Sequence, residues 1–264
     1  MVLLHGCKIF SEYIQKGGVA KTTTTYNLAA AKAMTGQKVL MVDLDPQASL
    51  TISCAMNPDA EEYLNANICN LFDGRTNPAG CAFAVEASGL ENLYIIPSNI
   101  DLAVTETKLV IGRNSDVQLR KAIKKLESYF DYCFIDCPPQ LGPLLINALV
   151  AADEVIIPVK TDYLAYRGLK ALIDTIHYIQ SGDGDRSLNP DLILDGIIAT
   201  LYDQRKSDQQ DVLKLIEKID TPLLGVIKNA ADVPRDVIEG LPVVLANKKA
   251  PTAKAYVEIA IKIL

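Results

Sequence analysis

Short apolar runs alternate with amphipathic stretches along most of the chain. The apolar runs predict strands at residues 7–14, 38–45, 93–97, 132–136, 154–159, 192–200 and 224–227. Apolar positions at helical spacing predict helices at residues 22–35, 61–72, 101–111, 115–130, 144–152, 163–179, 208–219 and 252–264. This alternation predicts an α/β fold with a doubly wound, mostly parallel sheet and helices on both faces. Because the pattern contains no linker, internal repeat or low-complexity segment, we expect a single domain over residues 1–264.

The segment between the first strand and the first helix, residues 15–23 (QKGGVAKTT), has the composition of a phosphate-binding loop. Adjacent glycines let the backbone approach a ligand and turn its N–H groups inward, and the following helix presents its positive dipole end. Lys21 adds a point charge, and Thr22 is placed to offer its hydroxyl to magnesium. We expect a nucleotide's phosphates to bind Gly17, Gly18, Val19, Ala20, Lys21, Thr22 and Thr23.

Acidic residues follow two of the predicted strands. Asp45 and Asp136 both end apolar runs, so both should lie at the carboxyl edge of the sheet, where doubly wound folds bind ligands. Asp136 fits a Walker B acid that holds magnesium through water. Asp43 lies on the same face of its strand as Asp45, so one could orient the attacking water while the other supports the metal. A single Asp at a strand end is often only a turn former, but two such ends beside a phosphate loop favour a nucleotide site.

Several sequence blocks resemble one known family. A lysine, Lys16, precedes the two glycines, as in the deviant Walker A motif of the ParA/MinD family. The blocks 43–47 (DLDPQ), 136–142 (DCPPQLG) and 147–153 (NALVAAD) resemble successive motifs of ParA/Soj partition ATPases. The resemblance covers the chain from about residue 8 onward and weakens after residue 200.

The resemblance implies a P-loop NTPase that hydrolyses ATP with Mg²⁺ and forms a nucleotide-sandwich homodimer. Lys16 would reach the phosphates of the partner subunit, as an arginine finger does. Lys21 would bind the β- and γ-phosphates, Asp45 would position the hydrolytic water, and Asn229 would contact adenine. Thr22 and Asp136, with Asp43, would serve the metal.

The family also implies nonspecific DNA binding by the ATP-bound dimer and a ParB-type partner that stimulates hydrolysis. Arg205 occupies the position of a DNA-contacting arginine, with Lys206 and Arg235 as candidate neighbours. The chain departs from the family at Ala20, where a glycine is usual, and in the segment 227–235 (IKNAADVPR), which lacks the usual arginine. Four basic residues at 120, 121, 124 and 125 are either a solvated helix face or part of a DNA surface.

Composition and charge modify this interpretation in few respects. The formal net charge of -6 argues against general affinity for nucleic acid, although local charge can differ. The six cysteines form no CxxC pair and predict reduced thiols rather than a zinc site. We expect a cytoplasmic protein that associates with the nucleoid when ATP is bound, and no membrane contact. A plasmid role and a chromosomal role are both compatible with the sequence.

Three other functions stay open. The first is a MinD-like positioning ATPase that acts on a membrane, although the chain shows no basic amphipathic C-terminal extension. The second is a nucleotide-gated scaffold with little turnover, which the altered segment 227–235 favours. The third is a biosynthetic P-loop ligase, which would need a substrate pocket and against which Lys16 argues.

Overall fold

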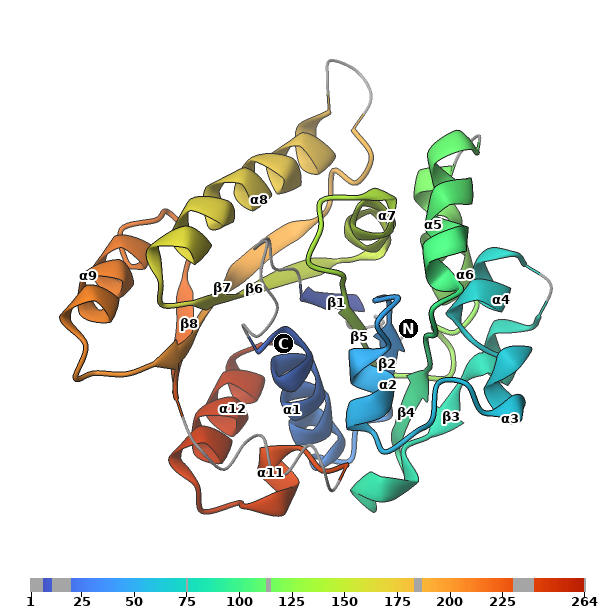
Figure 1. Cartoon of the computed structure of the whole chain (residues 1–264), viewed down its shortest axis with the longest axis horizontal. Coiled ribbons are helices and arrows are strands. Elements are labelled where there is room, and N and C mark those ends of the chain that lie inside the picture. The colour runs from blue at the N-terminus through green and yellow to red at the C-terminus, as the bar shows by residue number, and fades with distance from the viewer. Residues whose placement is uncertain are drawn as a thin grey trace.

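The fold is an eight-stranded sheet between two layers of helices, seen in a computed structural model that describes residues 7–10, 20–74, 76–112, 115–182, 187–229 and 240–263 (Figure 1). The strands are β1 (Cys7–Phe10), β2 (Val39–Asp43), β3 (Phe83–Ala84), β4 (Leu93–Ile96), β5 (Tyr132–Asp136), β6 (Glu154–Lys160), β7 (Ile193–Tyr202) and β8 (Leu223–Lys228). Their order in the sheet is β3-β4-β2-β5-β1-β6-β7-β8. All neighbouring pairs are parallel except β3 with β4, so the predicted fold class is confirmed.

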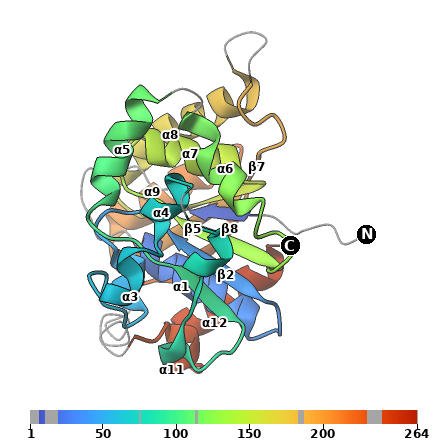
Figure 2. The same ribbon diagram turned by 90° about the vertical axis from the view of Figure 1, so that its right-hand side faces the viewer.

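Helices cover both faces of this sheet. They are α1 (Lys21–Ala33), α2 (Ser49–Ser53), α3 (Glu61–Leu64), α4 (Ile68–Phe72), α5 (Leu102–Ile111), α6 (Gln118–Ile123), α7 (Pro143–Ala151), α8 (Tyr163–Ser181), α9 (Ser207–Ile216), α11 (Val243–Ala246) and α12 (Pro251–Lys262). In Figure 1, α1, α11 and α12 lie below the sheet and α5, α7 and α8 above it, and Figure 2 shows the same layers from the side.

Each face of the sheet has its own apolar core, and the alternation of side chains along the strands divides the two. On β2, Leu40 and Val42 pack toward α4–α9, whereas Val39 and Met41 pack toward α1, α2, α11 and α12. The hydroxyls of Thr24 on α1 and Tyr256 on α12 lie 3.1 Å apart within the second core. The helix that carries the predicted phosphate-binding residues is therefore fixed to α12.

Most predicted elements are present, with a few differences. The helix predicted at residues 61–72 is two short helices, because Asn67 accepts hydrogen bonds from the N–H groups of Cys69 and Asn70 and starts α4 afresh. The short elements β3, α2 and α11 were not predicted. Residues 11–14 of the first predicted strand lie outside the described residues. In the part of the chain that the structure describes, no helix has the length and apolarity needed to cross a bilayer.

Candidate nucleotide site

The phosphate loop joins α1 through an unusual backbone conformation at Ala20. This residue has φ 69° and ψ 24°, in the left-handed region that favours glycine, and its carbonyl accepts the N–H of Thr24. A glycine at this position would adopt the same conformation without strain, which gives a physical reason for the family's usual residue. Lys16, Gly17, Gly18 and Val19, which we predicted to bind phosphate, lie outside the described residues.

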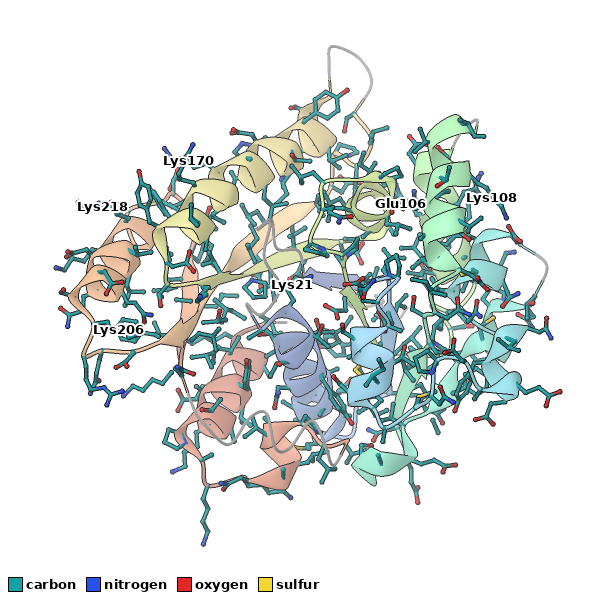
Figure 3. All side chains as sticks on the ribbon, in the orientation of Figure 1. Lys21, Glu106, Lys108, Lys170, Lys206 and Lys218 are labelled. Carbon is teal, nitrogen blue, oxygen red and sulfur yellow. The ribbon has the colours of Figure 1, made fainter. Side chains whose placement is uncertain are left out.

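Lys21, the first residue of α1, reaches across the carboxyl edge of the sheet. Its side chain is nearly buried, and Nζ donates a hydrogen bond of 2.9 Å to the carbonyl of Cys137. Cys137 directly follows β5, so Lys21 contacts the first residue of the loop that connects β5 to α7. The only predicted phosphate cation among the described residues therefore lies next to Asp136. Figure 3 shows Lys21 at the centre of the molecule.

Thr22 and Asp136 are brought together as predicted. The hydroxyl of Thr22 donates a hydrogen bond of 2.6 Å to Oδ2 of Asp136, and Thr25 Oγ1 lies 3.5 Å from Oδ1. Burial raises the pKa of Asp136 to about 6, while Lys21 and the Thr22 hydroxyl act in the opposite direction. A hydroxyl and a carboxylate in contact beside a phosphate loop are the oxygen donors that Mg²⁺ prefers. The residues present therefore fit a magnesium ion with a nucleotide.

The carboxylate of Asp43 is buried and accepts hydrogen bonds from Thr51 and Asp45. It is fully buried and lies opposite Asp136 in the pairing of β2 with β5. Its Oδ2 accepts the N–H of Thr51 at 2.8 Å and the hydroxyl of Thr51 at 2.7 Å, and its Oδ1 accepts the N–H of Asp45 at 3.2 Å. Burial first, and then the nearby Asp136, raise the pKa of Asp43 to about 7. This geometry suits a residue that supports the metal site and the Asp45 turn, rather than one that binds the ion directly.

Asp45 begins the turn after β2 and is only partly buried. Its Oδ1 accepts the N–H of Gln47 at 2.9 Å, so the carboxylate also forms the turn that leads to α2. The N–H of Leu44 donates to the carbonyl of Asp136 at 2.9 Å, which keeps the ends of β2 and β5 together. Asp45 thus lies at the same edge as Lys21 and Asp136, as the strand positions predict.

Thr51 was missed by sequence analysis although it contacts Asp43 twice. Its hydroxyl also accepts the N–H of Ser98 at 3.0 Å, which links β2 to the segment after β4. The sequence signal is weak, because Thr51 lies eight residues beyond Asp43 in a helix too short to show periodicity. In the described segments, no group of three or more His, Cys, Asp or Glu side chains could hold a metal.

Asn229, Arg205 and Lys206, the other predicted ligand residues that the structure describes, lie at the far flank of the sheet. Asn229 follows β8, is exposed, and donates its N–H to the carbonyl of Tyr202 at 3.0 Å. Arg205 is exposed, but its guanidinium binds Asp203 through Nη2–Oδ2 at 2.8 Å and Nε–Oδ1 at 2.9 Å. Lys206 is exposed beside it, at the left of Figure 3. Arg235 lies outside the described residues.

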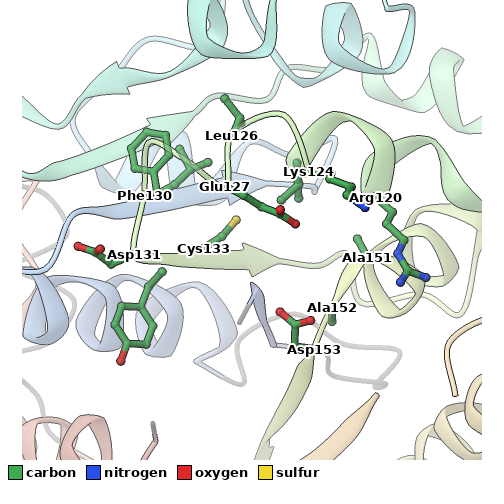
Figure 4. Close-up of a pocket in the computed structure, with 13 residues that line it drawn as sticks. Arg120, Lys124, Leu126, Glu127, Phe130, Asp131, Cys133, Ala151, Ala152 and Asp153 are labelled. Atoms are coloured by element: carbon green, nitrogen blue, oxygen red, sulfur yellow. The ribbon is translucent and has the colours of Figure 1, made fainter. Parts of the chain in front are cut away.

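Two residues of the basic cluster line a separate cavity. Arg120 and Lys124 border a cavity of about 200 Å³ together with residues at the starts of β5 and β6, among them Cys133 and Asp153 (Figure 4). These strand starts form the amino edge of the sheet, opposite the edge that carries Lys21 and Asp136. The cavity is therefore separate from the nucleotide site.

Comparisons with known proteins agree with this geometry. A family model described as an AAA domain matches residues 7–193. The chain is 35% identical to the sporulation initiation inhibitor protein Soj of Bacillus subtilis over 255 residues, which covers 96% of each protein. It is 34% identical to the chromosome partitioning protein ParA of Myxococcus xanthus, covering 93% of this chain and 83% of that protein.

Solved structures extend the comparison. The cobyrinic acid a,c-diamide synthase of Mycobacterium smegmatis with bound ADP and magnesium has a TM-score of 0.79 and 35% identity, covering 97% of this chain and 93% of that one. The cell division ATPase MinD of Pyrococcus furiosus has a TM-score of 0.75, with coverage of 97% and 98%, and at 24% identity it shows the fold alone. Fold, site and sequence together place the chain in the Soj/ParA family of P-loop ATPases.

Proposed function

We propose that this chain is a DNA-partition ATPase that binds ATP with Mg²⁺, dimerises, binds DNA without sequence preference and acts with a ParB-type partner. The names of the relatives Soj and ParA support the partition role. Solved relatives with bound ADP or an ATP analogue and magnesium support the choice of ligands. The protein would be cytoplasmic and would associate with the nucleoid when ATP is bound.

The observation that carries the hydrolytic role is the contact of 2.6 Å between Thr22 and Asp136. In this proposal both residues serve a magnesium ion, Asp136 through water, and the ion neutralises charge on the transferred phosphoryl group. Lys21 binds the β- and γ-phosphates and Asp45 positions the attacking water. Asp43 supports Asp45 through the hydrogen bond from the Asp45 N–H.

Substitution of Thr22 tests this site directly. We expect Thr22→Ala to lower the kcat of ATP hydrolysis about 100-fold and to raise the Mg²⁺ concentration needed for nucleotide binding, because one of the preformed oxygen donors is lost. Thr35→Ala, at the exposed C-terminal end of the same helix, is the matched control and should behave as wild type. Equal turnover in the two variants would contradict the role of Thr22.

The proposed dimer depends on the residues of the phosphate loop. Lys16 would reach the phosphates of the partner subunit and Gly17, Gly18, Val19, Ala20 and Thr23 would surround those of its own. We expect wild type to sediment as a dimer with a slowly hydrolysed ATP analogue and as a monomer with ADP. Lys16→Ala should abolish the dimer while it still binds nucleotide, and a Lys16→Ala dimer of normal affinity would exclude the contact.

DNA binding is tested by titration of nonspecific duplex DNA with ATP or ADP over a salt series. Arg205, Lys206 and Arg235 are the proposed contacts, and Asn229 the proposed adenine contact. We expect binding with ATP only, and a weaker affinity with a flatter salt dependence for Arg205→Ala, because fewer counterions are released. Lys214→Ala, exposed and further along α9, is the charge-matched control.

Further measurements distinguish the three other functions. Pelleting with anionic liposomes that requires ATP would favour a MinD-like role. ATP-dependent dimerisation without hydrolysis, even with DNA and partner present, would favour a nucleotide-gated scaffold. The structural relative named as a diamide synthase favours a ligase; hydrolysis of ATP without any acceptor substrate would argue against it.

A further inference from the structure

Glu106 of α5 reaches the start of α7, the helix that follows Asp136 and the connecting loop. Helix α7 begins with Gly142 as its N-cap and Pro143 at its first position, so neither supplies a capping side chain. The Glu106 carboxylate lies beside Gly142 at the start of this helix, where the backbone N–H of Leu144, in the first turn, acts to lower its pKa. A carboxylate at a helix N-terminus satisfies a free N–H and interacts favourably with the helix dipole. A residue from a different helix therefore caps α7.

The same carboxylate closely approaches Gly142. A Cβ atom at position 142 would lie 2.6 Å from Oε1 of Glu106, closer than real Cβ contacts. The backbone of Gly142 has φ -139° and ψ -177°, which any residue adopts. The backbone conformation therefore does not require glycine, and the lack of a side chain instead leaves room for Glu106. Glu106 and Gly142 are thus sterically matched.

This contact lies at one end of the loop that adjoins the nucleotide site. The loop starts at Cys137, where the carbonyl accepts Nζ of Lys21, and ends at Gly142. Glu106 is partly buried, and burial together with the nearby charge of Asp45 raises its pKa. A carboxylate on α5 therefore lies in the electrostatic surroundings of the residue that we propose to position water.

We propose that Glu106 is a positioning residue of the ATPase site, which caps α7 and fixes the α7 end of the loop 137–142, whose other end contacts Lys21. The inference rests on the proposed hydrolysis of ATP at this site. Catalysis depends steeply on geometry, and a misplacement of about 1 Å can lower the rate by about 100-fold. Glu106 anchors the α7 end of this loop, whose other end meets Lys21 at the Cys137 carbonyl.

Steady-state kinetics of two Glu106 variants separate positioning from simple stability. Glu106→Ala removes the cap, and we expect kcat to fall by about 10-fold to 100-fold with the Kd for ATP changed less than about threefold. Glu106→Gln keeps an acceptor oxygen for the Leu144 N–H, and its kcat should stay within about threefold of wild type. Thr107→Ala, exposed on the same helix, is the control. A kcat of Glu106→Ala near wild type, or equal losses in both Glu106 variants, would overturn the proposal.

Gly142→Ala gives an independent test without removal of the acid. The added methyl displaces the flexible end of Glu106, so this variant should lose as much kcat as Glu106→Ala. Because both changes break the same contact, the double variant should be no slower than either single one. Multiplied losses in the double variant would show that Gly142 and Glu106 act separately, and would overturn the proposal.

Hydrogen exchange keeps the inference testable if the proposed function fails. If wild type hydrolyses no ATP under any condition, the proposed function is wrong, but the cap can still be measured. Glu106→Ala should speed amide exchange at Leu144 and Leu145 by about fivefold, the equivalent of a typical lost cap, whereas Thr107→Ala should not. Unchanged exchange at Leu144 in Glu106→Ala would overturn the proposal by itself.

Discussion

Ala20 holds a left-handed backbone conformation at the point where the phosphate loop becomes α1. Its φ of 69° is unfavourable for a residue with a Cβ atom, so the chain carries strain next to Lys21. The departure from the family's glycine was visible in the sequence, but its energetic meaning depends on the backbone angle. The loop keeps its shape at the expense of some stability.

Replacement of Ala20 should relieve this strain. We expect Ala20→Gly to raise the free energy of unfolding by up to about 1 kcal/mol, because the released strain exceeds the added entropy of the unfolded chain. Urea denaturation followed by far-UV circular dichroism measures the change. Ala31→Gly, in the last turn of the same helix, should lower stability by about 1 kcal/mol. Similar losses in both variants would contradict strain at Ala20.

The buried carboxylate of Asp43 should make the free energy of unfolding depend on pH. Its pKa of about 7 in the folded protein lies above the ordinary value of 3.8, so its contribution to stability is fully present below pH 3.8 and lost as pH rises through 7. In metal-free buffer we expect the titration of Asp43 to lower the unfolding free energy of wild type by about 2 kcal/mol between pH 5 and pH 7.

Asp43→Asn should flatten this dependence, because the amide does not ionise. Urea unfolding at several pH values, with a chelator present, gives the slope for each protein. The dependence should not vanish, since burial raises the pKa of Asp136 in the same direction. Asp211→Asn, on an exposed ion pair, is the control and should keep the wild-type slope. Equal slopes for wild type and Asp43→Asn would show that Asp43 does not titrate in this range.

Strand β7 packs so closely against the chain at β8 that position 196 of β7 has room only for glycine. A Cβ atom at Gly196 would lie 2.6 Å from Cγ of Leu224 and 2.7 Å from the carbonyl oxygen of Pro222. Because that oxygen belongs to the backbone, the clash is relieved only if β8 shifts. The position of β8 determines where Asn229 and the Arg205 turn lie, so this packing supports one flank of the molecule.

Gly196→Ala should therefore destabilise the protein by about 2 kcal/mol, in the range of overpacked cores. Thermal unfolding of the variant measures the loss. Gly80→Ala, where the added methyl meets only ordinary contacts at 3.9 Å, should change stability much less. A small loss of stability in Gly196→Ala would indicate that β8 can shift away from β7 at little cost.

Long elements were predictable because their periodicity accumulates over many residues. The seven long strands and the helices α1, α5, α7, α8, α9 and α12 follow from apolar spacing alone. The short helices α2 and α11 and the strand β3 leave too few residues for any period, and the break between α3 and α4 depends on one asparagine cap. In the site, strand ends predicted the meeting of Asp43, Asp45 and Asp136. Thr51 was not predictable because α2 is too short to show a period, and Glu106 because it meets Gly142 from a distant segment.

At the scale of the whole molecule, charge is distributed unevenly. The acids and Lys21 of the nucleotide site occupy the carboxyl edge, Arg120 and Lys124 border the cavity at the amino edge, and Arg205 lies at the flank of β7 and β8. The overall charge of -6 opposes DNA at long range, so binding would depend on local cations. Arg205 is already paired with Asp203, and DNA would have to compete with that carboxylate.

Removal of Asp203 should therefore strengthen DNA binding. We expect Asp203→Ala to raise the affinity of the ATP-bound protein for duplex DNA several-fold at low salt, because Arg205 is released and one negative charge is lost. The double variant Asp203→Ala/Arg205→Ala separates these effects: the gain should disappear if Arg205 contacts DNA. Asp211→Ala, which removes a comparable exposed acid on α9, serves as the charge control. An equal gain in Asp211→Ala would mean that only net charge matters.

The hydrogen bond from Lys21 to the Cys137 carbonyl has a consequence for calorimetry. A phosphate that recruits the Lys21 ammonium takes it from that carbonyl, so the heat of nucleotide binding is the difference between two charge-assisted hydrogen bonds. The measured enthalpy therefore understates the strength of the new contact. The loop 137–142 then keeps its anchor at Gly142 and loses the one at Cys137. An occupied phosphate site and a loosened loop thus accompany each other.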